Sequence, residues 1–174
     1  MANVGNYHNS LVLIQSQTVT SSVASVTFST GINSIYNTYL FILSNLTAST
    51  SGIFRCRVGN GGGLAITGYL GGRTQINMSS ASSWATSTTN TAFAPINSSV
   101  NTSNPNGSGT LLIMNATNGS YPCLFADAFI NTAGVTGYSI CGTTCSTTNL
   151  TQVQFFLNAA NINTAVITLY GVNE

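Results

Sequence analysis

Short apolar segments bounded by Gly, Asn and Ser recur along the whole chain, a pattern typical of β-strands. In Ile53–Val58, three apolar residues alternate with Arg55 and Arg57, which predicts a strand with one apolar and one charged face. Thr38–Leu46 is almost continuously apolar, as in a strand covered on both faces. Since no window shows a convincing helical period, the pattern predicts an all-β protein.

The spacing of these segments predicts about ten strands in a single domain, a jelly-roll-like antiparallel β-sandwich. The expected strands are Ser10–Gln17, Val23–Ser29, Thr38–Leu46, Ile53–Val58, Leu64–Leu70, Thr74–Met78, Thr110–Asn115, Tyr121–Asn131, Val135–Cys141, Gln152–Asn158 and Thr164–Val172.

The domain is expected to span residues 10–174, after a flexible N-terminal segment of residues 1–9. Residues 79–109 are dense in Ser, Thr and Asn and carry little apolar patterning. We therefore predict a long surface loop there, attached to the body by Trp84, Phe93 and Ile96.

Two glycine-rich sites are predicted to be turns between strands. Gly59–Gly63 lacks the Gly-Lys-Ser/Thr ending of a phosphate-binding loop, so a hairpin loop is expected. Gly71 and Gly72 are predicted to form the turn of a hairpin between Leu64–Leu70 and Thr74–Met78.

The charge content narrows the function further. Of 174 residues, 3% are charged, against about 25% in ordinary soluble proteins, and none is Lys. The ionisable inventory comprises Arg55, Arg57, Arg73, Asp127, Glu174 and one imidazole, His8. Binding to nucleic acid or to an anionic membrane needs clustered cations, and most acid/base enzymes need paired carboxylates. We therefore expect no enzyme activity, no cofactor, no metal and no nucleic-acid partner.

A neutral surface of Ser, Thr, Asn and Gly is better suited to packing against other subunits than to a free monomer, because net charge aids solubility. Met1–Ser10 lacks the basic and apolar regions of a signal peptide, and the longest apolar runs are too short to span a bilayer. We therefore expect no membrane insertion. We expect instead that the protein is released by cell lysis or is processed from a longer chain.

Candidate contact residues fall into two chemical groups. The three arginines have two interpretations. They bind an acidic sugar or the carboxylate of a partner protein, or they are simply solvent-exposed side chains. Three aromatic residues, if exposed, would stack on sugar rings. The candidates for partner or ligand contact are Arg55, Arg57, Arg73, Tyr69, Trp84 and Tyr121.

The cysteines and the internal carboxylate have mainly structural interpretations. The spacing of Cys141 and Cys145 suits neither a redox motif nor a zinc site, and leaves open a disulfide across a Gly-containing turn. Cys56 is expected in the core with its apolar neighbours. Asp127 is expected to pair with an arginine or to accept a backbone hydrogen bond, because calcium or acid catalysis would need further carboxylates.

Three segments carry a recognisable succession of strand patterns: Leu11–Ile14 leading through a Ser- and Thr-rich stretch to Val26–Phe28, Gly31–Tyr39 running into Leu40–Asn45, and Asn161–Val172. The second contains a Tyr-x-x-Tyr element at Tyr36 and Tyr39, and the third contains Leu-Tyr-Gly ending at Gly171. Together they resemble small virion surface proteins of tailed phages and related viruses. The resemblance implies a jelly roll that trimerises, similar to the C1q and tumour-necrosis-factor heads.

The leading hypothesis is a non-enzymatic virion surface component, either a capsid decoration or a fibre or receptor-binding head. Its expected partners are copies of itself, most simply in a homotrimer, other virion proteins and a host surface glycan. The expected location is the outside of the viral particle. The alternative is a secreted carbohydrate-binding, lectin-like module.

Overall fold

The computed structural model describes residues 11–77, 80–94, 99–100, 102, 107–117, 121–130, 135–143 and 149–173; within these ranges, side chains are described for 11–72, 91–94, 100, 102, 107–117, 121–127 and 149–173. All regular structure in the described ranges is β. The strands are β1 (Leu11–Val19), β2 (Ser25–Phe28), β3 (Thr38–Ala48), β4 (Gly52–Asn60), β5 (Gly63–Leu64), β6 (Tyr69–Asn77), β7 (Ser80–Asn90), β8 (Ser99–Val100), β9 (Gly107–Met114), β10 (Cys123–Ile130), β11 (Val135–Thr143), β12 (Gln152–Leu157) and β13 (Ile162–Val172).

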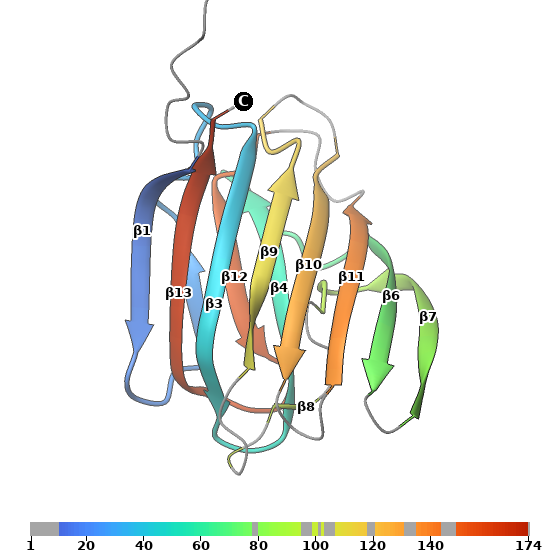
Figure 1. Cartoon of the computed structure of the whole chain (residues 1–174). Helices are drawn as coiled ribbons and strands as arrows, with labels where there is room; N and C mark the ends of the chain where they lie inside the picture. The colour runs from blue at the N-terminus through green and yellow to red at the C-terminus, as the bar shows by residue number, and fades with distance from the viewer. Residues whose placement is uncertain are drawn as a thin grey trace, which may run out of the picture.

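The strands form two layers (Figure 1). An eight-stranded sheet runs in the order β1-β13-β3-β9-β10-β11-β6-β7, and behind it lies a smaller sheet in the order β2-β12-β4-β5, with β8 paired to β4. Neighbouring strands are antiparallel throughout. The predicted all-β, single-domain antiparallel β-sandwich is therefore confirmed. It has more strands than expected because β7 was not predicted and because β5 and β8 are only two residues long.

The chain passes repeatedly between the two sheets, which is how a jelly-roll-like sandwich is connected. The large sheet holds β1, β3 and β13, whereas the small sheet holds β2, β4 and β12. The first and last strands pair along their lengths, from Leu11 opposite Val172 to Val19 opposite Ala165. Each sheet is therefore built from segments far apart in the sequence.

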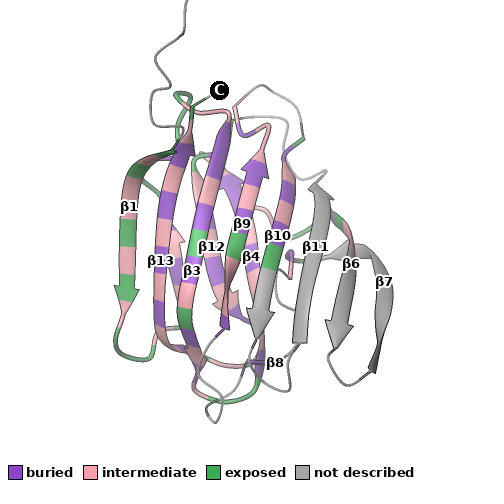
Figure 2. Ribbon diagram, viewed as in Figure 1, coloured by how far each residue is buried: buried purple, intermediate pink, exposed green. Residues whose placement is uncertain are grey.

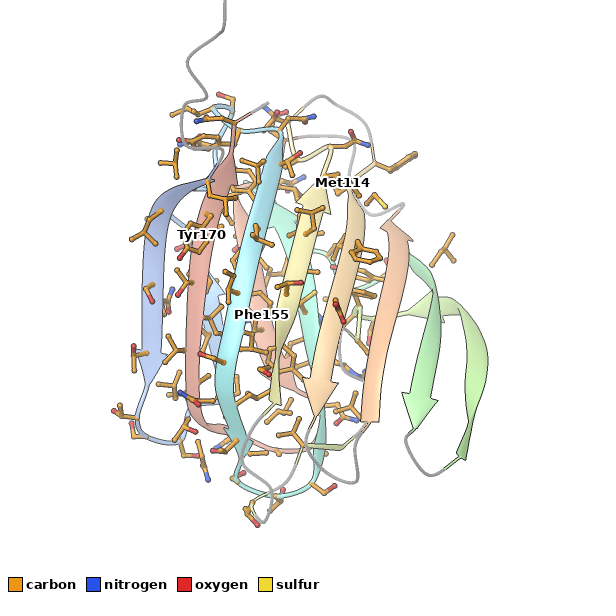
Figure 3. The ribbon with its side chains drawn as sticks, viewed as in Figure 1. Met114, Phe155 and Tyr170 are labelled. Carbon is orange, nitrogen blue, oxygen red and sulfur yellow. The ribbon has the colours of Figure 1, made fainter. Side chains whose placement is uncertain are left out.

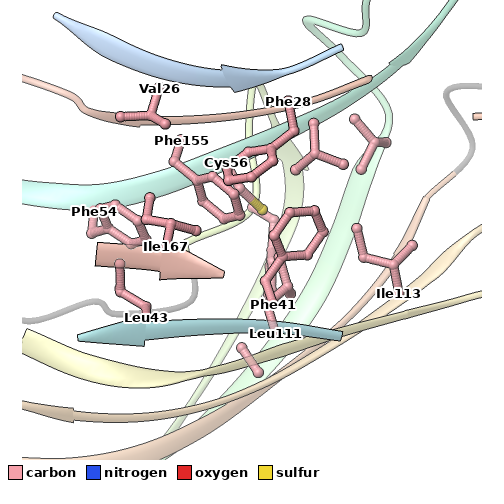
Figure 4. Close-up of a cluster of buried hydrophobic side chains, with 14 of the residues drawn as sticks. Val26, Phe28, Phe41, Leu43, Phe54, Cys56, Leu111, Ile113, Phe155 and Ile167 are labelled. Atoms are coloured by element: carbon pink, nitrogen blue, oxygen red, sulfur yellow. The ribbon is translucent and has the colours of Figure 1, made fainter. Parts of the chain in front are cut away.

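Strand alternation places one set of side chains between the sheets. Buried and less buried positions alternate along β3, β4, β12 and β13 (Figure 2). An aromatic cluster occupies the space between the layers (Figure 4). Phe155 contacts Phe41 edge-on, with ring centroids 5.1 Å apart, and stacks on Phe54 at 5.7 Å. Phe28 packs against Phe41 at 5.2 Å, so both sheets contribute to one continuous core.

The hairpin predicted at Gly71 and Gly72 is wrong. Both glycines lie inside β6, opposite Cys141 and Ile140 of β11. A glycine pair permits a tight turn without requiring one, and here the strand continues because both of its edges find partners. The hairpin loop predicted at Gly59–Gly63 is confirmed, since Asn60 pairs with Gly63 across it.

The surface loop predicted for residues 79–109 is also wrong over much of its length. Ser80–Asn90 forms β7, an eleven-residue strand paired with β6 at the edge of the large sheet. A Ser- and Thr-rich segment lacks the apolar alternation that signals a strand, yet Thr favours extended backbone. The predicted attachment by Phe93 is confirmed: Phe93 is buried, and its backbone pairs with Cys56.

Candidate interaction surfaces

The outer face of the small sheet is mostly polar, with Phe156 as an outward-facing apolar residue. It carries Ser25 and Thr27 from β2, Gln154 from β12, and Arg57 from β4. Register aligns Thr27, Gln154 and Arg57 in one row across three strands. The Gln154 amide lies 3.4 Å from the hydroxyl groups of both Ser25 and Thr27. The face is thus a hydrogen-bonding surface with a cationic edge.

The two arginines predicted to share a strand face do so, and both are half-buried. The guanidinium of Arg57 lies 4.5 Å from the Phe156 ring centroid, and its Nε donates to the Thr91 carbonyl at 3.0 Å. The Nε of Arg55 is buried without a hydrogen-bond partner. Arg57 is therefore occupied by contacts within the chain, rather than held ready for a ligand.

Tyr69 is not the exposed sugar-stacking residue predicted from the sequence. Its side chain is fully buried. The hydroxyl accepts a hydrogen bond from the Val58 backbone N–H at 2.9 Å and donates to the Ala65 carbonyl at 3.2 Å. Because the polar end of the ring is satisfied inside the protein, Tyr69 braces β6 against β4 and offers no surface to a ligand.

The other predicted contact residues have different placements. Tyr121 lies just before β10 and keeps 51% of its surface exposed. Arg73 lies on β6, opposite Ala85 and Ser139, and Trp84 lies on β7, opposite Thr74. The side chains of Arg73 and Trp84 lie outside those described, so their contact roles stay predictions.

The cysteine predictions are tested only in part. Cys56 is fully buried in the core, as expected. Cys123 is a half-buried free thiol on β10. Cys141 lies on β11 with its side chain outside the described set, and Cys145 lies outside the described residues, so the disulfide is untested.

Asp127 is exposed on the outer face of the large sheet, opposite Thr110. It forms no ion pair with Arg55 or Arg57, whose strand belongs to the other sheet. Nowhere in the described residues do three His, Cys, Asp or Glu side chains gather as metal ligands. A search of the same residues for a helix long and apolar enough to cross a membrane also finds none.

An apolar row crosses the outer face of the large sheet. The sequence indicates it only at Thr38–Leu46, which is apolar on both faces, and does not indicate its partners on the other strands. Strand register aligns Leu13 with Tyr170, Tyr170 with Leu40, Leu40 with Leu112, and Leu112 with Phe125. We call these five residues the apolar row. Their neighbours along each strand point into the core, so the row faces outward. Tyr170 and Met114 mark this region toward the upper end of the front sheet (Figure 3).

A second row runs beside it and is mostly polar. It consists of Ser16, Thr168, Ile42, Thr110 and Asp127, again in direct cross-strand register. The hydroxyl groups of Ser16 and Thr168 lie 3.1 Å apart and share a hydrogen bond. We call this set the polar row. The outer face is therefore divided into an apolar and a hydroxyl-rich half.

The tyrosine and glycine elements singled out in the sequence meet in space. Tyr39 lies opposite Gly171 in the β3–β13 ladder, and Tyr36 packs edge-on against Tyr39, with centroids 5.9 Å apart. The Tyr39 hydroxyl donates to the Asn33 carbonyl at 2.7 Å and accepts from the Asn33 N–H at 2.9 Å. Burial raises the pKa of Tyr39 above its ordinary value, and the hydrogen bond to Asn33 opposes that shift. This corner is structural, because its polar groups are paired internally.

Neither a scan against protein-family models nor a search of curated proteins finds a match. The surfaces described above are therefore the basis for assigning a function.

Proposed function

We propose that the chain is a non-enzymatic structural protein of a virion surface, either a capsid-decorating subunit or a fibre or receptor-binding head. It acts by packing against copies of itself and against other virion proteins or a host surface. The observation that carries this proposal is the outer face of the large sheet, where an outward-facing apolar row, exposed at Leu13 and half-buried at its other four positions, lies on a nearly chargeless β-sandwich. Exposed contiguous apolar surface on a soluble fold is typical of interaction sites.

The resemblance to small virion surface proteins supports the same assignment. Its Tyr-x-x-Tyr and Leu-Tyr-Gly elements supply Tyr36, Tyr39 and Gly171, which lie together at one corner of the sandwich. Members of that group form trimers, so we propose a homotrimer as the assembled state. Asp127, the single internal carboxylate, is exposed with no ion-pair partner among the described residues, which supports a role without acid/base chemistry.

Fractionation of a virus-producing culture tests the proposal. Particles separated on a density gradient are expected to carry the chain in a fixed ratio to the major capsid protein, and to retain it after washing. Recovery of the chain only from the particle-free fractions would remove the virion assignment.

Assembly should depend only weakly on salt. With three cations and two anions in the chain, screening has few charge pairs to act on, so apolar burial and neutral hydrogen bonds must supply the association energy. Sedimentation velocity is expected to give the same oligomer at low ionic strength and at about 1 M NaCl. A large loss of oligomer in high salt would instead place an arginine ion pair in the subunit interface.

A carbohydrate-binding module is the second candidate, favoured by Tyr121, whose ring is half exposed. Sugar rings stack on exposed aromatic side chains while nearby amides bind the hydroxyls. The burial of Tyr69 removes one of the three aromatic contacts expected for this function. Binding on a glycan array that is abolished by Tyr121→Ala would favour the lectin-like module, and an array without binding would eliminate it.

A further inference from the structure

We infer that the apolar row is the surface at which copies of this chain meet. The inference rests on the proposed self-packing function and goes beyond it by naming the interface and its occupant, a second copy of the same chain. The row comprises Leu13, Tyr170, Leu40, Leu112 and Phe125, drawn from five adjacent strands of the large sheet.

The row is extended at one side by further apolar residues. Leu11 pairs with Val172, and Met114 pairs with Cys123. A second pair of such residues therefore lies beside the apolar row at each of its two ends. Leu13 is 61% exposed and Leu11 is 40% exposed, and both lie in β1, whose register with β13 shifts between Leu13 and Gln15. Inside a folded sheet, such residues lose their contact with water only when another surface covers them.

The size of the face fits a stable protein–protein contact. Strands about 4.8 Å apart and about nine residues long, with a rise of about 3.4 Å per residue, give the five strands that carry the apolar row a face of about 700 Å². A standard interface buries about 800 Å² on each partner. The face is therefore large enough for neighbouring copies around a three-fold axis to cover the apolar row.

The charge pattern favours a second copy as the occupant. Among the described side chains of this face, Asp127 is the one charged group, and it lies at the end of the polar row. The apolar row itself carries no charge, so copies that meet there, away from Asp127, do so without like-charge repulsion. Hydroxyl groups such as those of Ser16 and Thr168 both donate and accept hydrogen bonds, so the polar row is complementary to itself.

The opposite side of the sandwich does not have this self-complementarity. The outer face of the small sheet carries Arg55 and Arg57 on neighbouring outward positions of β4. Two copies that met through this face would bring these cations together, which is unfavourable at a desolvated interface.

A matched pair of charge insertions tests the inference. Leu13 is 61% exposed within the apolar row, and Ile66 is 62% exposed in the segment between β5 and β6. Because both side chains are solvent-exposed in the single chain, Leu13→Arg and Ile66→Arg should fold equally well. In the assembly, only Leu13→Arg would bury an unpaired charge.

Light scattering across a dilution series is the measurement. We expect wild type and Ile66→Arg to share one oligomeric mass, and Leu13→Arg to dissociate toward 18.0 kDa at a concentration at least about tenfold higher. Leu112→Asn, at the centre of the row, should dissociate in the same way, with thermal unfolding confirming that the separated subunits are folded.

The outcomes separate the inference from the proposed function. If wild type is oligomeric and neither Leu13→Arg nor Leu112→Asn weakens it, the interface lies elsewhere and self-packing survives. If wild type is itself a stable monomer at high micromolar concentration, both the interface and the self-packing function are overturned.

Discussion

Replacing Phe155 with Ala should destabilise the protein by about 3–5 kcal/mol, enough to unfold much of a marginally stable domain. Phe155 lies between the sheets with ring centroids 5.1 Å from Phe41, 5.7 Å from Phe54 and 6.1 Å from Phe28. Truncation removes three aromatic contacts at once and leaves a cavity that neighbouring strands cannot fill without moving.

Denaturant unfolding measures this effect, with Phe156→Ala as the matched control. Phe156 is the next residue on β12, but it faces outward beneath Arg57. Its loss should cost about 1 kcal/mol or less, the value of an exposed cation–π contact and partial burial. Equal effects of the two substitutions would contradict the assignment of Phe155 to the inner face of the strand.

The second large effect is expected at Gly171. A Cβ at this position would lie 2.5 Å and 2.6 Å from Cε2 and Cγ of the Tyr36 ring, well inside ordinary contact distance. Tyr36 also packs against Tyr39, so the ring has little room to withdraw. Gly171→Ala should therefore destabilise the protein by about 1–3 kcal/mol.

A double-mutant cycle isolates the cause. In a Tyr36→Ala background the clash is gone, so adding Gly171→Ala should have little further effect on the free energy of unfolding. If Gly171→Ala costs the same in both backgrounds, the glycine is needed for some reason other than the approach of Tyr36. The cycle thus tests whether the two motifs recognised in the sequence act as one packed unit.

The sequence was sufficient to predict the strands with strong apolar alternation. Ile53–Val58 reads directly as a strand with an inner apolar and an outer arginine face, and the structure confirms this for Arg55 and Arg57. Ser80–Asn90 could not be read in the same way. Its Ser and Thr side chains carry no burial signal, and its strand forms through pairing with β6.

Tyr69 and the apolar row were beyond sequence reasoning for different reasons. From the sequence, Tyr69 was predicted to be exposed. Only the fold shows that its hydroxyl group hydrogen-bonds to the backbone of Val58 and Ala65. The apolar row joins residues as distant in sequence as Leu13 and Tyr170. No local pattern reports such an alignment, because it depends on the register of five strands.

The two outer faces of the sandwich give the subunit two different surfaces. The large sheet carries the apolar row that we propose as the self-association surface, whereas the small sheet carries mainly arginine, amide and hydroxyl groups. This division follows from the chemistry of the side chains on each sheet.

Electron microscopy of purified, negatively stained particles labelled with an antibody against this chain tests the virion assignment most directly. The account predicts label on the outside of intact particles, at regular capsid positions for a decorating subunit or at fibre ends for an attachment head. Particles that carry no label, while the chain remains in the particle-free fraction, would contradict it.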